Sequence, residues 1–260
     1  MSGTRLHFPK APATKVAAGL FRKHSEPETG LLIVAHGERG GKGNNDGLAQ
    51  LTEAVSLALP ELTVCSAVLN GEQSLEDVLS RMRNERILVY PYFLSDGYFV
   101  RTVLPRRLGL SQTRCSALKR RFKILKPFGL SDMLPDLITS LVRDAAGNRD
   151  LSALDVLIAA HGSTSGPRPK DCTEALAARL QALGTFPAVR CAYISEPPFL
   201  EPAIETLHRP TVVVPLFAGE GAHGIEDIAA ALKALPEHSC VTGIVGNSVQ
   251  AAQLIASSIQ

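Results

Sequence analysis

Asp155–Thr164 reads DVLIAAHGST, and Leu31–Arg39 reads LLIVAHGER. Each stretch is an apolar run with β-branched residues that ends in a small residue, a histidine and a glycine, and the two histidines stand 125 residues apart. Such a run is typical of a buried parallel strand that leads into a tight loop. We therefore expect His36 and His161 at the carboxyl ends of strands, the edge at which open α/β sheets bind ligands.

A second pair of matching stretches follows at nearly the same offset. Leu88–Gly97 reads LVYPYFLSDG and Val212–Gly221 reads VVVPLFAGEG, 124 residues apart. Strands and helices alternate four times in each half, which indicates an α/β fold with parallel sheets covered on both faces. We predict two similar doubly wound domains at 31–148 and 149–260, each with a four-stranded sheet in the order 2-1-3-4, related by a pseudo-twofold axis. Residues 1–30 match nothing in the second half and are predicted to be an extension.

Short apolar runs and amphipathic segments give the expected elements. Strands are predicted at Leu31–Ala35, Thr63–Leu69, Arg86–Leu94, Phe122–Pro127, Asp155–Ala160, Ala188–Ile194, Thr211–Phe217 and Cys240–Val245. Helices are predicted from Leu48 to Leu59, from Leu75 to Arg83, after Gly97 as far as Leu108, from Leu134 to Ala146, from Cys172 to Leu183, and at Leu200–His208, Gly224–Leu235 and Ser248–Ser257.

The composition limits the class of protein. Of the 260 residues 45% are hydrophobic, the net charge is only +2, and the five cysteines form no C-x-x-C pair. These features indicate a globular cytoplasmic protein with reduced thiols, without a disulfide frame, zinc site or iron–sulfur cluster. No apolar run is long enough to span a membrane, and the first residues lack the apolar core of a signal peptide. A monomer and a homodimer both fit.

Three polar residues of the second half are expected to share one crevice. His161 follows the first strand of that half, Glu196 follows the second, and His223 lies just beyond the third. A lone histidine beside a strand is more often structural than functional. Two histidines at adjacent strand ends, with a carboxylate nearby, favour a site, and this set suits a first-row divalent metal.

The first half lacks this set. At the repeat positions of His223 and Glu196 it has Phe99 and Gly71, with Glu72 one residue away. Only His36 remains, and it is interpreted as a vestige or as part of the wall of the site.

Basic residues are concentrated in Arg101–Lys126, which carries nine Lys or Arg residues and no acid. Such a run is usually a solvated face, and no interleaved aromatic residues support binding to nucleic acid. Our functional interpretation is contact with a small polyanion, with Arg101, Arg106 and Arg107 as the binding residues. The glycine-rich loop that begins at His36 lacks the spacing of a P-loop, so no nucleotide is expected.

Three motifs together resemble the class II tetrapyrrole chelatases, above all the sirohydrochlorin cobaltochelatases and ferrochelatases of cobalamin and siroheme biosynthesis. They are I-x-A-H-G-S around His161, S-E-P around Glu196 and V-V-P-L-F-x-x-x-G-x-H-x-x-x-D-I around His223, and the resemblance extends from Leu31 to about Gln260. It implies the two-domain chelatase fold and a lyase that inserts a metal into sirohydrochlorin or a related precorrin without ATP. It also implies that His161, His223 and Glu196 are both metal ligands and catalytic residues.

The physiological metal and the activity itself leave alternatives open. Co²⁺ is expected first, but this ligand set also accommodates Fe²⁺ and Ni²⁺. The main alternative is a carrier of tetrapyrrole or metal that has the same fold and no turnover. A hydrolase with His161 as base is a weaker alternative, because Ser163 lacks the G-x-S-x-G setting of a nucleophile.

Overall fold

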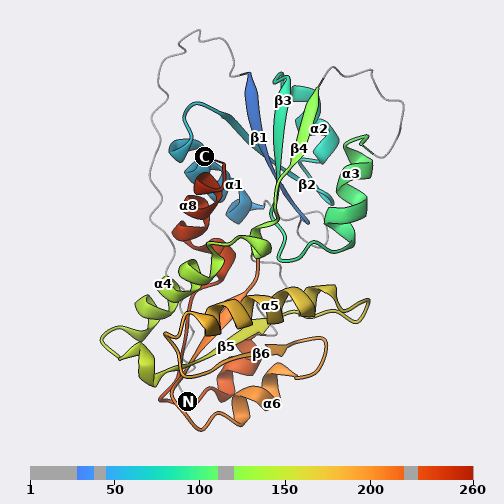
Figure 1. The fold of residues 1–260 in the computed structure, drawn as a ribbon. Coiled ribbons are helices and arrows are strands. Elements are labelled where there is room, and N and C mark those ends of the chain that lie inside the picture. The colour runs from blue at the N-terminus through green and yellow to red at the C-terminus, as the bar shows by residue number, and fades with distance from the viewer. Residues whose placement is uncertain (1–27, 38–44, 111–119, 220–227, 260) are drawn as a thin grey trace, which may run out of the picture.

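The computed structural model describes residues 28–37, 45–110, 120–219 and 228–259. Its eight strands are β1 (Thr29–Ala35), β2 (Thr63–Val68), β3 (Arg86–Pro91), β4 (Arg121–Ile124), β5 (Asp155–Ala160), β6 (Val189–Tyr193), β7 (Thr211–Leu216) and β8 (Cys240–Val241). They form two parallel four-stranded sheets, in the orders β2-β1-β3-β4 and β6-β5-β7-β8 (Figure 1). The predicted fold class and strand order are confirmed.

The helices cover both faces of each sheet. They are α1 (Asp46–Ala58), α2 (Leu75–Arg81), α3 (Leu104–Arg107), α4 (Leu134–Ala146), α5 (Arg168–Ala182), α6 (Leu200–Glu205) and α8 (Val249–Ser257), with a π-helix, η1 (Phe99–Val103), directly before α3. Short 3₁₀ turns occur at η2 (Phe128–Leu130), η3 (Leu151–Ala153), η4 (Leu232–Ala234) and η5 (Val245–Asn247). The helix predicted at Gly224–Leu235 lies partly outside the described residues; residues 228–231 are helical and run into η4.

Three predicted elements end earlier in the structure, β3 at Pro91 and not Leu94, β4 at Ile124 and not Pro127, and α6 at Glu205 and not His208. Two further predictions also need correction. The last strand, predicted at Cys240–Val245, ends at Val241, and the chain then leads to Gly246, which packs on the backbone of Ala218. A Cβ atom on Gly246 would lie 2.4 Å from the Ala218 carbonyl oxygen, so only glycine fits without a shift. The segment after Gly97, predicted as one ordinary helix, begins as the π-helix η1, in which the Leu104 amide donates to the Phe99 carbonyl five residues back.

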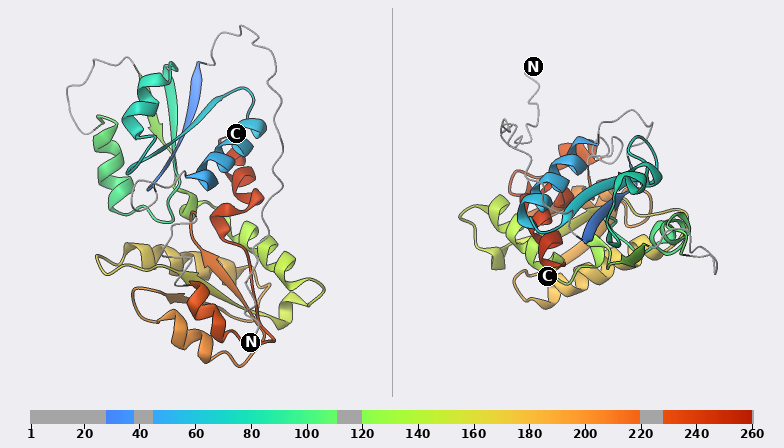
Figure 2. Two further views of the ribbon diagram at one scale, coloured as in Figure 1. Left: turned by 180° about the vertical axis from the view of Figure 1, so that it is seen from behind. Right: turned by 90° about the horizontal axis from the view of Figure 1, so that it is seen from above.

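The last helix of each half packs against the other half. Helix α8, from the end of the chain, lies beside α1 on the first sheet, whereas α4, from the first half, packs on α5 and β7 of the second (Figures 1 and 2). One apolar core therefore runs through both halves, from Ile33 and Leu51 to Ile158 and Leu180. The domain boundary between residues 148 and 149 is predicted from the internal repeat, and it stays a prediction.

Separate apolar clusters cover the outer faces of the two sheets, with α2 and α3 on the first and α6 with η4 on the second. The order of layers is thus helices, sheet, shared helices, sheet, helices. The strands of the first sheet run toward the second half, and their carboxyl ends come close to the start of α5 (Figure 1). Of the helices that the structure describes, none has the length and apolar character needed to cross a bilayer.

Candidate functional site at the carboxyl edge of the second sheet

His161 lies where β5 emerges from the core. Every residue of β5 is buried, whereas the imidazole of His161 is exposed. Its Nδ1 lies 3.1 Å from the Gly162 carbonyl oxygen and 3.1 Å from Ser195 Oγ. Because a carbonyl can only accept, the contact with Gly162 is a hydrogen bond only when Nδ1 carries the proton. This tautomer leaves the lone pair on Nε2, which has no hydrogen-bond partner among the described residues and can bind a metal or a proton.

The Glu196 carboxylate lies on the neighbouring loop, which follows β6, whereas His161 lies on the loop that follows β5. The β5–β6 pairing continues past the strands, since the Ser195 amide donates to the His161 carbonyl over 2.9 Å. This register places Glu196 so that its Oε1 accepts from the Ser163 amide over 2.7 Å. Gly162, which lies between His161 and Ser163 in the chain, has φ +71°, and a Cβ atom there would lie 2.8 Å from Glu196 Oε1. The structure thus brings His161 and Glu196 together, as the strand order predicts.

Lys170 holds the loop that carries Glu196. Its Nζ donates to the Pro197 carbonyl over 2.7 Å and lies 5.4 Å from the centroid of the Tyr193 ring. Burial raises the pKa of Tyr193, so the phenol stays neutral beside the ammonium group. No sequence motif marks Lys170, because its partner is a backbone carbonyl 27 residues away.

His223 lies outside the described residues, so its place beside His161 stays a prediction. The first half supplies a relevant comparison, because Phe99 occupies the repeat position of His223. Phe99 lies against His36 there, with ring centroids 4.6 Å apart and an interplanar angle of 80°. Within residues 28–37, 45–110, 120–219 and 228–259, no group of three His, Cys, Asp or Glu residues could hold a metal ion. The predicted metal site therefore depends on His223.

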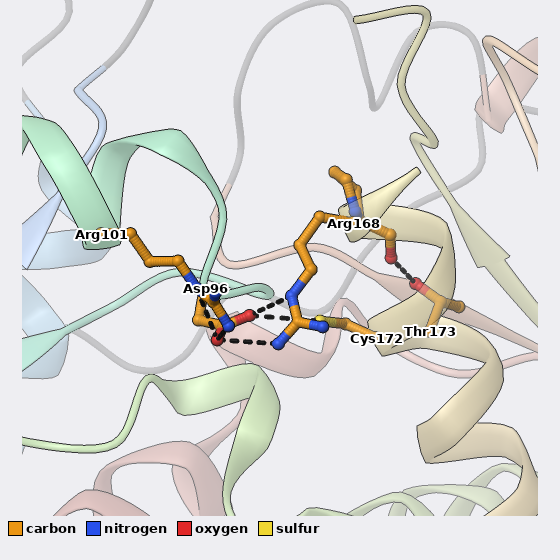
Figure 3. Close-up of polar contacts among 6 residues, drawn as sticks. Asp96, Arg101, Arg168, Cys172 and Thr173 are labelled. Carbon is orange, nitrogen blue, oxygen red and sulfur yellow. Dashed lines mark hydrogen bonds and ion pairs between the residues drawn. The ribbon is translucent and has the colours of Figure 1, made fainter. Parts of the chain in front are cut away.

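An ion-pair network joins the two halves next to this edge. Asp96, in the turn after β3, accepts from Arg101 Nε over 3.0 Å and from Arg168 Nη2 over 2.8 Å (Figure 3). The Arg168 guanidinium, followed by that of Arg101, holds the pKa of the Asp96 carboxyl well below its usual range. Neither Asp96 nor Arg168 was identified from the sequence, since a pairing over 72 residues has no local signal.

The three predicted substrate-binding arginines have different surroundings. Arg101 pairs with Asp96, and Arg107 pairs with both carboxylate oxygens of Glu76. Arg106 is exposed and forms no ion pair with a residue that the structure describes. Their role in substrate binding stays a prediction, and part of the basic run, residues 111–119, lies outside the described residues.

A depression in the surface lies at the opposite edge of the second sheet. It is lined by Arg149, Leu154, Pro210, His238 and Cys240, at the amino ends of the strands. Ligands of open α/β sheets bind at the carboxyl ends instead, so His161 and Glu196 mark the candidate site.

Comparison with known proteins gives consistent matches to one family. A family model described as CbiX matches residues 30–145 and again residues 155–260. The solved structure of CbiX, the terminal enzyme of siroheme biosynthesis in denitrifying bacteria, is 33% identical with a TM-score of 0.73, and the match covers 88% of this chain and 97% of that one.

Two further relatives are more distant. A probable sirohydrochlorin cobaltochelatase from Halobacterium salinarum is 22% identical over 217 residues, which cover 76% of this chain and 74% of the relative. SirB from Bacillus subtilis, solved with Fe³⁺, shares the fold at 18% identity and a TM-score of 0.71, over 89% of this chain and 94% of that one.

Proposed function

The chain belongs to the CbiX family, and we propose that it is a sirohydrochlorin chelatase, a lyase that inserts a divalent metal into the tetrapyrrole without a nucleotide. The observation that supports this most directly is the pair formed by His161 and Glu196 on adjacent loops at the carboxyl edge of the second sheet. Cobaltochelatase and siroheme-synthesis functions are named for relatives of this chain.

Metal insertion requires a base and a metal site in the same place. The metal ion replaces two pyrrole protons, so two N–H bonds break and both protons must be accepted. His161 Nε2 is free to ligate the incoming ion, and we assign the second imidazole to His223. One oxygen of Glu196 accepts from the Ser163 amide, while the other has no hydrogen-bond partner among the described residues. That oxygen can accept a pyrrole proton or bind the metal.

The second half is proposed as the working half because the first lacks two of the three groups. Phe99 offers no ligand atom, and Gly71, at the position of Glu196, offers no carboxylate. His36 alone cannot provide both a metal site and a proton acceptor.

The basic residues are proposed to bind carboxylate groups of the macrocycle. Arg106 can bind a carboxylate without losing an ion pair to any described residue. Arg101 and Arg107 would have to exchange their acidic partners, Asp96 and Glu76, for the substrate. Replacement of all three by alanine should raise the apparent KM and weaken its dependence on salt, with the fold unchanged. If the variant has the kinetics of the wild type, the basic stretch Arg101–Lys126 is a solvated face without a role in substrate binding.

One assay tests both which metal is preferred and whether the protein turns over as an enzyme. The purified protein is mixed with sirohydrochlorin and with Co²⁺, Fe²⁺ or Ni²⁺, and the absorbance of the metallated product is followed. We propose Co²⁺ as the preferred ion, in line with the name of the Halobacterium relative. Many turnovers per protein support the enzyme, whereas product limited to one equivalent supports the alternative, a tetrapyrrole or metal carrier. A cytoplasmic location, a monomeric or dimeric state and the lack of nucleic-acid binding remain predictions.

A further inference from the structure

Aromatic rings gather at the carboxyl edge of the first sheet. Phe93 follows β3, Tyr98 and Phe99 stand at the start of η1, and His36 follows β1. Phe99 contacts all three of the others, with ring centroids 6.3 Å from Phe93, 5.8 Å from Tyr98 and 4.6 Å from His36. We call these four residues the aromatic wall. Phe93 and Phe99 are half-buried on the core under α3, whereas Tyr98 is 66% exposed.

Two members of the aromatic wall, Tyr98 and Phe99, are specific to the first half, whereas His36 and Phe93 have His161 and Phe217 at their repeat positions. At the repeat positions of Tyr98 and Phe99 the second half has Ala222 and His223, so a small residue and an imidazole are replaced by two large rings. Tyr98 and Phe99 also stand at the start of a π-helix, a rare element that is frequent at functional sites. At these two positions the first half therefore has aromatic surface where the second half has one histidine.

An ion pair links the turn between Phe93 and Tyr98 to the second half. Asp96, two residues before Tyr98, is bonded to Arg168, which begins α5 directly after the His161 loop. The two carboxyl edges therefore come within ion-pair distance of each other (Figure 3). A flat ligand bound beside this ion pair could contact rings of the first half on one side and the loop that carries His161 on the other.

We propose that the aromatic wall binds the planar face of the tetrapyrrole while the second half delivers the metal. This inference rests on the proposed function. A conjugated macrocycle offers a π-face that pairs with aromatic rings in offset or edge-to-face geometry. A protein partner is disfavoured, because one exposed ring beside ion pairs is far smaller than the area that a stable interface buries.

The test measures binding of metal-free sirohydrochlorin, with no metal present, by titration of its absorbance. Tyr98→Ala and Phe99→Leu should each raise the Kd about three- to tenfold, because each removes one ring contact and Phe99→Leu keeps an apolar side chain. The control is Leu57→Ala on α1, which removes a side chain that is 79% exposed and should leave the Kd unchanged. Thermal unfolding of each variant confirms that it is folded.

Each outcome decides the proposal. Wild-type Kd values in both folded variants, alongside normal metal insertion by the wild type, would refute the aromatic wall and leave the proposed function standing. Raised Kd values in a protein that binds sirohydrochlorin but never inserts metal would support the aromatic wall and refute the enzyme. A wild-type protein that does not bind sirohydrochlorin would refute both.

Discussion

Gly162 is the residue whose replacement tests the geometry of the site most sharply. It stands between His161 and Ser163 with φ +71°, and a Cβ atom would lie 2.8 Å from Glu196 Oε1 and 2.9 Å from Glu196 Cγ. In Gly162→Ala the carboxylate must therefore move by several tenths of an ångström. This movement lengthens its 2.7 Å hydrogen bond from the Ser163 amide.

Gly184 supplies a matched control at the end of α5. Its φ is +68°, almost equal to that of Gly162, but a Cβ atom there would meet no atom within 4 Å. Both Ala variants therefore carry the same backbone strain, about 1–2 kcal/mol. Only Gly162→Ala also disturbs a hydrogen bond to a charged group, which contributes about 1.5–3 kcal/mol. We expect a loss of roughly 2.5–5 kcal/mol in the unfolding free energy for Gly162→Ala and about 1–2 kcal/mol for Gly184→Ala.

Urea unfolding and the metal-insertion rate are measured on both variants. Gly162→Ala should also slow insertion at least tenfold, because the displaced Glu196 carboxylate no longer lies beside the metal position next to His161 Nε2. Gly184→Ala should keep the wild-type rate of insertion. Equal losses of stability and equal rates in the two variants would show that Glu196 relaxes freely and that its placement does not matter for insertion.

Two further changes test the contacts around the site. Asp96→Asn should lower the unfolding free energy by about 1 kcal/mol at pH 7, a modest value because both arginine partners are substantially exposed. Since the native pKa of Asp96 is depressed, this difference should persist down to the unfolded pKa of about 3.9 and shrink below it; urea titrations at pH 7, 5 and 3.5 check the sign, and a difference that grows on acidification would contradict it. Lys170→Met should slow insertion several-fold by loosening the Glu196 loop, with Lys233→Met, on an exposed turn, as the unaffected control; equal rates in the two variants would remove Lys170 from the account.

The strand order and two of the three site residues could be predicted because both follow from local patterns. The repeated apolar runs define strands, and the 2-1-3-4 order then places residues that follow neighbouring strands at one edge. This reasoning brought His161 and Glu196 together, and the hydrogen bond from the Ser163 amide to Glu196 confirms their proximity. The pairing of His161 with His223 rests on the same reasoning and stays a prediction.

Other features have no signal in a single sequence. The apolar faces of Leu134–Ala146 and Val249–Ser257 are the same whichever sheet they cover, so the exchange of α4 and α8 could not be foreseen. The five residues of Phe99–Val103 are too few for apolar spacing to distinguish a π-helix from an α-helix. The link from Asp96 to Arg168 depends on how the two halves pack, which no local pattern contains.

The central claim is that the second half carries the metal site, and the rate of Co²⁺ insertion into sirohydrochlorin by folded histidine variants tests it directly. His161→Ala and His223→Ala should each lose about 10²–10⁴ in rate, because each removes a metal ligand or a proton acceptor. His36→Ala should lose a few-fold at most, since Phe99 leaves it without a partner ligand at the repeat position of His223. An inactive His36→Ala protein together with a fully active His223→Ala protein would place the site in the first half and contradict the account.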